Sequence, residues 1–197
     1  MRGTGLTVLC TIGGIVVGGC VMTHSSPPVS DTPAPHAAVE PEVLAAMQKL
    51  SWLRGHWDGK GMLGTPAGDV TQDGPWKVEP AYDGRYLRLE FNAVVDEGKS
   101  PPNRFVGYFT FDAEKKHYRT VWLNVDNLFQ FHETGTLNDA GTALTLISEH
   151  KRPDGTTARI RSVFTRVDEA HVTCEDHRLN EKDEPTKKTF GFTLTRP

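Results

Sequence analysis

Glycines recur at alternate positions in the stretch Gly55-His56-Trp57-Asp58-Gly59-Lys60-Gly61, with Trp57 in the one alternate position that is not glycine. Such glycines weaken a strand, because they pack no side chain and lose much backbone freedom on folding. They are therefore expected where another backbone approaches closely or where the strand bends sharply. The first strand of a closed barrel meets both conditions. We therefore predict that an antiparallel β-barrel begins at this stretch.

Alternation of apolar and polar residues continues from His56 to the end of the chain. Turn residues such as Asp83-Gly84 and Pro101-Pro102 interrupt it about every eight to twelve residues, which is typical of all-β barrels and sandwiches. The predicted strands are residues 56–63, 72–78, 86–95, 104–112, 117–125, 127–137, 142–150, 158–166, 171–179 and 188–196. Connections this short require antiparallel neighbours. We predict an all-β fold with a single closed antiparallel barrel of about ten strands, wide enough to hold a small ligand.

The first residues of the chain have the features of an export signal. Arg2 is followed by a short apolar run from Leu6 to Val17, and then by small residues before Cys20. The run is too short to span a bilayer. The segment resembles a bacterial lipoprotein signal, whose cysteine is lipidated and becomes the mature N-terminus, which would be Cys20 here. The alternative is a plain signal peptide with a coincidental cysteine.

Three regions follow from this interpretation. Residues 1–19 form the lipoprotein signal peptide, and residues 20–38, rich in proline and serine, form a disordered tether. Residues 39–197 form the barrel domain, which begins with a short amphipathic helix from Pro41 to about Trp52. This helix is expected to cover one end of the barrel. The predicted location is the bacterial cell envelope, lipid-anchored to a membrane and facing the periplasm.

The chain has three cysteines, Cys10, Cys20 and Cys174. Cys10 would leave with the signal peptide and Cys20 would carry lipid, so Cys174 would have no disulfide partner. We expect Cys174 to be a small buried hydrophobic residue rather than a nucleophile.

Two features, one on the first predicted strand and one on the last, resemble a known group of folds. Gly55-x-Trp57 on a first strand, with Arg196 at the end of the last, resembles the calycin superfamily, in which this Trp packs beneath the Arg at the closed end. The resemblance implies that Trp57 and Arg196 close one end of a lipocalin-like barrel. The wider sequence resembles the bacterial domain-of-unknown-function family numbered 1579, which has no settled activity. The matching segments are residues 53–61, 82–86, 107–112, 115–118 and 195–196.

The glycine-spaced motif at Trp57 also resembles nitrobindins, barrels that bind haem through a histidine near the C-terminus. Residues 186–197 contain no histidine, and the nearest candidates upstream are His171 and His177. Haem iron needs a placed axial ligand. We therefore predict no cofactor.

The strand at 171–179 is the best place to seek polar ligand contacts, because both of its faces are polar. Glu175 and His177 share one face, which either meets solvent or lines the cavity. Arg161, on the neighbouring strand, would form a cross-strand ion pair with Glu175 or would anchor a ligand carboxylate. Trp122 would line the cavity or fill the core. Trp122, Arg161, Glu175 and His177 are the predicted ligand-binding residues.

Several other classes of function lack support. The net charge of −3 gives no basic surface for nucleic acid. None of the eight histidines has the spacing of a local zinc motif, so no metal site is predicted. Motifs for a serine nucleophile, a phosphate loop and a dinucleotide site are also missing from the sequence, and no catalytic residue is assigned.

We therefore expect a membrane-anchored lipoprotein whose barrel binds a small, largely apolar molecule without transforming it. One alternative is a barrel enzyme with Glu175 and His177 as acid and base. The other is a structural envelope lipoprotein with a filled core. The sequence indicates no oligomeric state.

Overall fold

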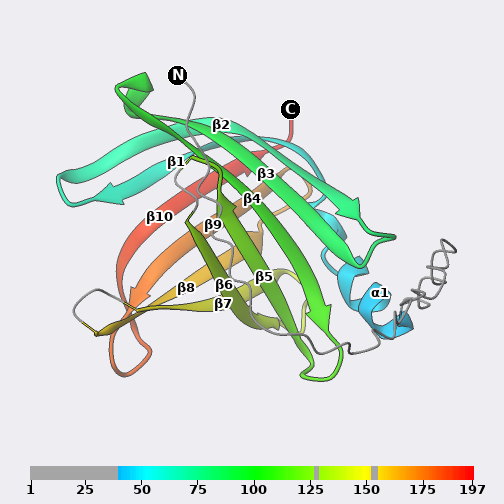
Figure 1. The fold of residues 1–197 in the computed structure, drawn as a ribbon. Coiled ribbons are helices and arrows are strands. Elements are labelled where there is room, and N and C mark those ends of the chain that lie inside the picture. Colours follow the sequence, from blue (N-terminus) through cyan, green and yellow to red (C-terminus); the bar gives the residue numbers. More distant parts are fainter. Residues whose placement is uncertain (1–39, 127–128, 152–154) are drawn as a thin grey trace, which may run out of the picture. The chain divides into compact units, whose positions relative to one another are not determined.

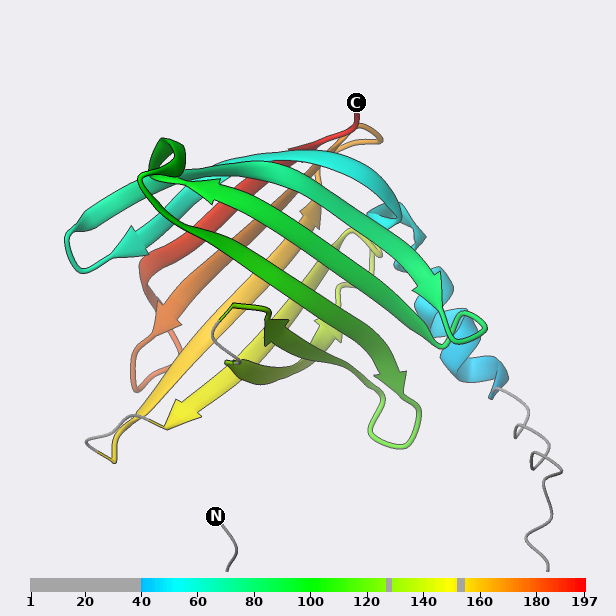
Figure 2. The same cartoon turned by 45° about the horizontal axis from the view of Figure 1, so that its top comes forward.

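The protein is a closed ten-stranded antiparallel β-barrel with one short α-helix, as Figures 1 and 2 show. The computed structural model describes residues 40–126, 129–151 and 155–197. The predicted signal peptide, the tether and Cys20 lie outside the described residues. The strands are β1 (Gly55–Thr65), β2 (Gly68–Ala81), β3 (Tyr86–Val95), β4 (Ser100–Asp112), β5 (His117–Asn124), β6 (Gln130–Leu137), β7 (Ala143–Lys151), β8 (Thr157–Arg166), β9 (His171–Leu179) and β10 (Pro185–Thr195). The predicted fold class is confirmed.

Each strand pairs with its neighbours in the sequence, and β1 closes the ring by pairing with β10. Two strands begin four residues earlier than predicted: β4 at Ser100 rather than at residue 104, and β2 at Gly68 rather than at residue 72. The pairing of β2 with β1 continues to Thr65 and Gly68 at the hairpin, beyond the part of the strand that carries buried side chains. The backbone ladder, and not burial, sets this boundary.

The glycines of β1 lie where neighbouring groups come close. A Cβ atom at Gly61 would lie 1.9 Å from the carbonyl oxygen of Gly191 on β10. A Cβ atom at Gly59 would lie 2.7 Å from Nε1 of Trp76 on β2. Real Cβ contacts are not this short, so larger residues at either position would push β1 away from its partners. This confirms close approach as the reason for the alternating glycines.

The helix α1 (Pro41–Gln48) lies at one end of the barrel (Figures 1 and 2). It begins with proline in the first turn, where the missing N–H costs nothing. Met47 on the helix is fully buried, and the hydroxyl of Tyr118 donates a 2.9 Å hydrogen bond to the carbonyl of Ala46. The α-helix ends at Gln48, and a short 3-10 turn (Ser51–Leu53) leads into β1.

Trp57 and Arg196 meet at the end of the barrel near the 3-10 turn, which we call the closed end. The guanidinium carbon of Arg196 lies 4.2 Å from the centre of the Trp57 ring, a cation–π contact. The indole Nε1 of Trp57 donates to the carbonyl of Leu53 at 2.9 Å. Arg196 also donates to the carbonyls of Glu169 and Arg54, at 2.9 and 3.0 Å. These contacts join the 3-10 turn to the first strand and to the end of the last strand.

Residues 38–197 form one compact unit. The buried hydrophobic cluster runs from Ala46 to Leu194, and the sheet closes entirely within this unit. Because the core and all strand pairs lie inside it, we expect the unit to fold without the residues that precede it. In the part of the chain described, no helix is both long and apolar enough to cross a lipid bilayer.

Candidate ligand-binding site

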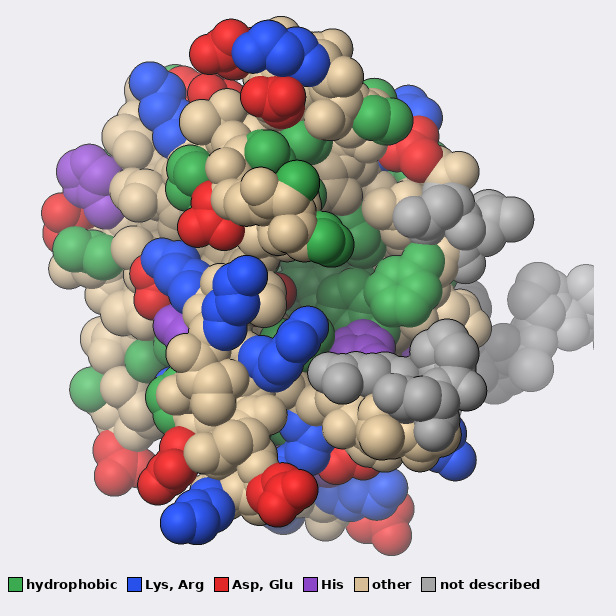
Figure 3. Space-filling view, turned by 90° about the vertical axis from the view of Figure 1, so that its left-hand side faces the viewer, with side chains coloured by type: hydrophobic (Ala, Val, Ile, Leu, Met, Phe, Trp, Pro, Cys, Tyr) green, Lys and Arg blue, Asp and Glu red, His purple; other side chains and the backbone are tan. Residues whose placement is uncertain are grey.

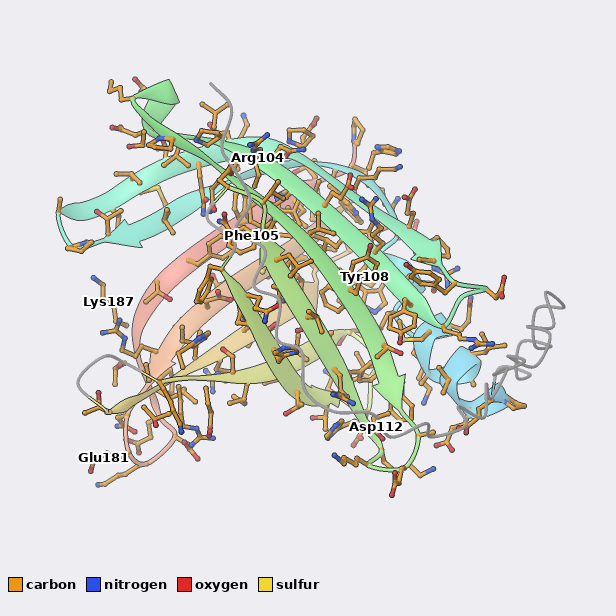
Figure 4. All side chains as sticks on the ribbon, in the orientation of Figure 1. Arg104, Phe105, Tyr108, Asp112, Glu181 and Lys187 are labelled. Atoms are coloured by element: carbon orange, nitrogen blue, oxygen red, sulfur yellow. The ribbon has the colours of Figure 1, made fainter. Side chains whose placement is uncertain are left out.

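The barrel is hollow toward the end opposite α1, which we call the open end. A cavity of about 420 Å³ lies there, and its lining includes Leu63, Phe190 and Arg178. Figure 3 views this end and shows hydrophobic side chains inside the hollow, a histidine within it, and lysine and arginine side chains along part of its edge. Figure 4 places Lys187, the strand partner of Arg178, at this end, while Asp112 lies at the other end.

Aromatic rings form much of the cavity wall. Trp76 stacks on Phe91 with ring centres 4.5 Å apart, and Phe91 stacks on Phe105 at 5.3 Å. Across the wall, Trp122 stacks on Phe131 at 6.2 Å. These residues face inward because they occupy alternate positions on their strands. The predicted residue Trp122 thus lies in the wall of the cavity.

Glu133 on β6 lies at the bottom of the cavity and is only 2% exposed. Its Oε2 accepts hydrogen bonds from Thr120 Oγ1 and Trp122 Nε1, both 2.9 Å long. Its Oε1 lies 2.6 Å from Ser162 Oγ. Burial raises the pKa of Glu133, and the three hydrogen bonds oppose this shift. The carboxyl group is therefore held by two donors from β5 and by one donor from β8.

Asp176 on β9 is a second carboxyl group at the same depth. It lies directly opposite Ser162 in the pairing of β8 with β9 and is half-buried in the cavity wall. Burial, and then the negative charge of Glu133, raise the pKa of Asp176 to about 7, while a hydrogen bond with Ser162 lowers it. Glu133, Ser162 and Asp176 together form what we call the cavity floor.

The barrel interior is filled on the other side of the cavity floor. Leu144, Val172 and Leu194 are buried there, toward the closed end. The floor therefore separates a packed half of the barrel from a hollow half. A ligand entering from the open end would meet aromatic walls first and the two carboxyl groups last.

Two further polar residues line the cavity nearer its opening. His150 Nε2 lies 3.0 Å from Ser148 Oγ, and the histidine ring packs against Phe131 with centres 5.6 Å apart. Burial lowers the pKa of His150, which keeps the ring neutral at pH 7. Arg178 reaches solvent at the opening.

The other three predicted ligand-binding residues do not line the cavity. Glu175 and His177 lie on the outer face of β9, where Glu175 is bonded to Lys188. Arg161 is the strand partner of His177 on the outer face of β8. Trp122 is thus the one predicted residue that the structure places in the cavity wall.

Sequence reasoning selected the correct strand but the wrong row of side chains for the cavity. On β9 it is Cys174, Asp176 and Arg178 that face inward. Cys174 is buried, as expected, and burial raises the pKa of its thiol well above the usual range. Glu133 was missed altogether, although a single carboxylate between the apolar side chains of Phe131 and Leu137 on one face is a detectable signal.

The polar side chains of the cavity do not resemble a metal centre. Within residues 40–126, 129–151 and 155–197, no three His, Cys, Asp or Glu side chains gather as metal ligands would. The arrangement is suited to enclosing an apolar body and to contacting one polar group at the floor.

Fold and site together define a hollow, lipocalin-like β-barrel. Residues 43–196 match the family described as "Protein of unknown function (DUF1579)", and the chain belongs to this family. The resemblance to family 1579 stated from the sequence is therefore confirmed. A search of curated proteins finds none that matches the sequence.

The solved structures to which the chain is similar are distant in sequence. The S-type phycobiliprotein lyase CPES from Guillardia theta is 9% identical, with a TM-score of 0.53 over 78% of this chain and 91% of that chain. A redesigned β-barrel, mFAP1, bound to DFHBI is 14% identical, with a TM-score of 0.36 over 77% of this chain and 98% of that chain. At such identities, the likeness to the lyase concerns the fold alone.

Proposed function

We propose that this protein is a membrane-anchored lipoprotein of the bacterial envelope whose barrel binds a small, largely apolar molecule without transforming it. The observation that carries the proposal is the cavity of about 420 Å³ with aromatic walls. Ligand sites typically measure about 300–1,000 Å³ and combine an apolar lining with a few convergent polar groups. The cavity has both properties.

The geometry gives less support to the alternatives. A structural protein with a filled core would have a solid interior, whereas Trp122 and Phe190 stand around a hollow. An enzyme using Glu175 and His177 would need both side chains in the cavity. They lie on the outer face of β9 instead.

A cavity-filling variant tests the binding function. Ile160 on β8 lines the cavity, and we expect Ile160→Trp to occupy the space that a ligand needs. Thermal melting of residues 38–197 is measured with a panel of fatty acids, alcohols, amines and aromatic compounds. A ligand at about 100 times its Kd should stabilise the wild type by about 2.7 kcal/mol, and this shift should be lost in Ile160→Trp.

The matched control is Val163→Trp, which places the same ring on the outer face of the same strand. It should keep the ligand-induced shift. If no compound in the panel raises the melting temperature of the wild type, or if Ile160→Trp responds as the wild type does, binding in this cavity is excluded.

Membrane anchoring has its own test at Cys20. We expect the mature protein in the membrane fraction to begin at Cys20 and to carry the mass of acyl chains, because stable anchoring takes more than one chain. Cys20→Ser should release the protein from that fraction. Equal fractionation of the two proteins would contradict the lipid anchor.

A further inference from the structure

Ser162 lies between the two carboxyl groups of the cavity floor. It contacts Glu133 at 2.6 Å on one side and lies directly opposite Asp176 in the pairing of β8 with β9 on the other. A serine hydroxyl has one hydrogen to donate, so it can donate to only one of them. The second contact becomes a hydrogen bond only if that carboxyl group is protonated and donates to Ser162. Both contacts of Ser162 are thus hydrogen bonds when Glu133 and Asp176 together hold one proton and one negative charge.

That negative charge has no cationic partner inside the cavity. Around Asp176, β8 presents Ser162 and β10 presents Phe190, and both are uncharged. The remaining titratable groups that line the cavity are His150, which is neutral, the buried thiol of Cys174, and Arg178 at the opening. Among the described residues, no basic side chain forms an ion pair with Asp176 or Glu133. A charge in apolar surroundings is costly without such a partner.

The aromatic walls above the floor also favour a positively charged ligand. Positive groups are attracted to the faces of aromatic rings within about 6 Å, and aromatic cages are a common means of binding ammonium ligands. Eight Trp and Phe residues line the cavity, among them Trp76, Phe91, Phe105, Trp122, Phe131 and Phe190. Asp176 is the floor carboxyl group that a ligand can reach, because both oxygens of Glu133 are already engaged by protein donors.

From this combination we infer that the cavity selects amphiphilic amines, molecules whose protonated nitrogen bonds to Asp176 while their apolar body lies against the aromatic walls. Glu133 strengthens the negative potential at the floor. The inference rests on the proposed binding function and adds the chemical class of the ligand. Binding such a cation requires ionised Asp176, so affinity for amines should increase as the pH rises toward 8, whereas affinity for a neutral analogue should not.

The test compares three probes with the same eight-carbon chain: octylamine, 1-octanol and octanoate. Their affinities for residues 38–197 are measured by isothermal titration calorimetry at pH 8. We expect octylamine to bind about tenfold or more tightly than 1-octanol, as one charge-assisted hydrogen bond implies. Octanoate should bind most weakly, since it brings a like charge to the floor.

Asp176→Asn should reduce the preference for octylamine over 1-octanol by about fivefold or more. The double variant Glu133→Gln/Asp176→Asn should abolish it. The matched control is Glu175→Gln, which removes a carboxylate one residue away on the outer face of β9 and should leave the preference unchanged.

Two outcomes separate this inference from the function on which it rests. Equal binding of all three probes, or an unchanged preference in Asp176→Asn, overturns the selection of amines and leaves the binding function intact. No binding of any probe, together with no melting shift across the panel, overturns both. If the variants fail to fold, the pH dependence of binding to the wild type tests the inference. The wild type's preference for octylamine should fall as the pH is lowered below about 7, and a constant preference from pH 8 to pH 5 overturns the inference.

Discussion

Replacing Glu133 with alanine should lower the free energy of unfolding by about 3–5 kcal/mol, which would rank among the most damaging single changes in this chain. The carboxylate accepts hydrogen bonds from Thr120, Trp122 and Ser162, and alanine leaves all three donors without this acceptor. Each buried donor left unsatisfied costs about 1–3 kcal/mol. The total stays below the sum because the hydroxyls of Thr120 and Ser162 can turn toward other acceptors, whereas the indole N–H of Trp122 cannot.

Glu133→Gln is the matched control, because it keeps the shape of the side chain and the number of its contacts. The amide oxygen can accept from Thr120 and Trp122, and the amide nitrogen can donate to Ser162, whose own hydrogen is then free for Asp176. We expect this variant to remain within about 1 kcal/mol of the wild type. Urea denaturation at pH 7 measures both variants. Equal losses in the two would mean that the negative charge of the carboxylate, and not the number of its contacts, determines the role of Glu133.

The same control changes the titration of Asp176. The negative charge of Glu133 helps to raise the pKa of Asp176 to about 7, so Glu133→Gln should lower that pKa, as measured by NMR of the Asp176 carboxyl carbon. A carboxyl group whose pKa is higher in the folded state contributes stability that is present at low pH and is lost as the pH rises through its folded pKa. From about pH 4 to 7, the wild type should lose stability through Asp176 by at most about 1.4 kcal/mol per pH unit. The loss should be smaller in Glu133→Gln.

The strands were predictable because the information that defines them is local. The bounds of β3 and β9 agree with the sequence prediction residue for residue, since alternation and flanking turn residues suffice to place them. The start of β6 was predicted too early, at residue 127 rather than Gln130. There the chain turns after Asn124, whose side chain accepts a hydrogen bond from the N–H of Asp126. An alternating pattern does not reveal such a turn.

The cavity floor was not predictable in the same way, because it depends on contacts between distant strands. Alternation divides β9 into two rows, but both rows are polar, so the pattern does not say which one faces inward. The answer depends on the register of the whole barrel, which puts Asp176 opposite Ser162. Ser162 in turn contacts Glu133, a residue 29 positions away in the sequence. A buried carboxylate is costly alone, and its three donors can be recognised only after the barrel has closed.

At the closed end, Trp57→Ala should also cost about 3–5 kcal/mol, the usual range for removing a large buried aromatic side chain. The Trp57 side chain is 1% exposed, its Nε1 bonds to the carbonyl of Leu53, and its ring lies beneath Arg196. The position adds to the effect because Trp57 lies on β1, which pairs with β10 to close the barrel. These strands are the farthest apart in the sequence, so the entropy cost of bringing them together is large.

Trp57→Phe separates the two roles of this side chain. It keeps an aromatic face beneath Arg196 but loses the hydrogen bond to Leu53, so we expect a loss of about 1–2 kcal/mol. In a double-mutant cycle, Trp57→Ala and Arg196→Ala should show a coupling of about 0.5–2 kcal/mol, the worth of the cation–π contact and of the packing that surrounds it. Because the cavity lies toward the opposite end, Trp57→Phe should bind octylamine as the wild type does. A loss below about 1 kcal/mol in Trp57→Ala, or no coupling to Arg196, would mean that pairing of the β1 and β10 backbones closes the barrel without this contact.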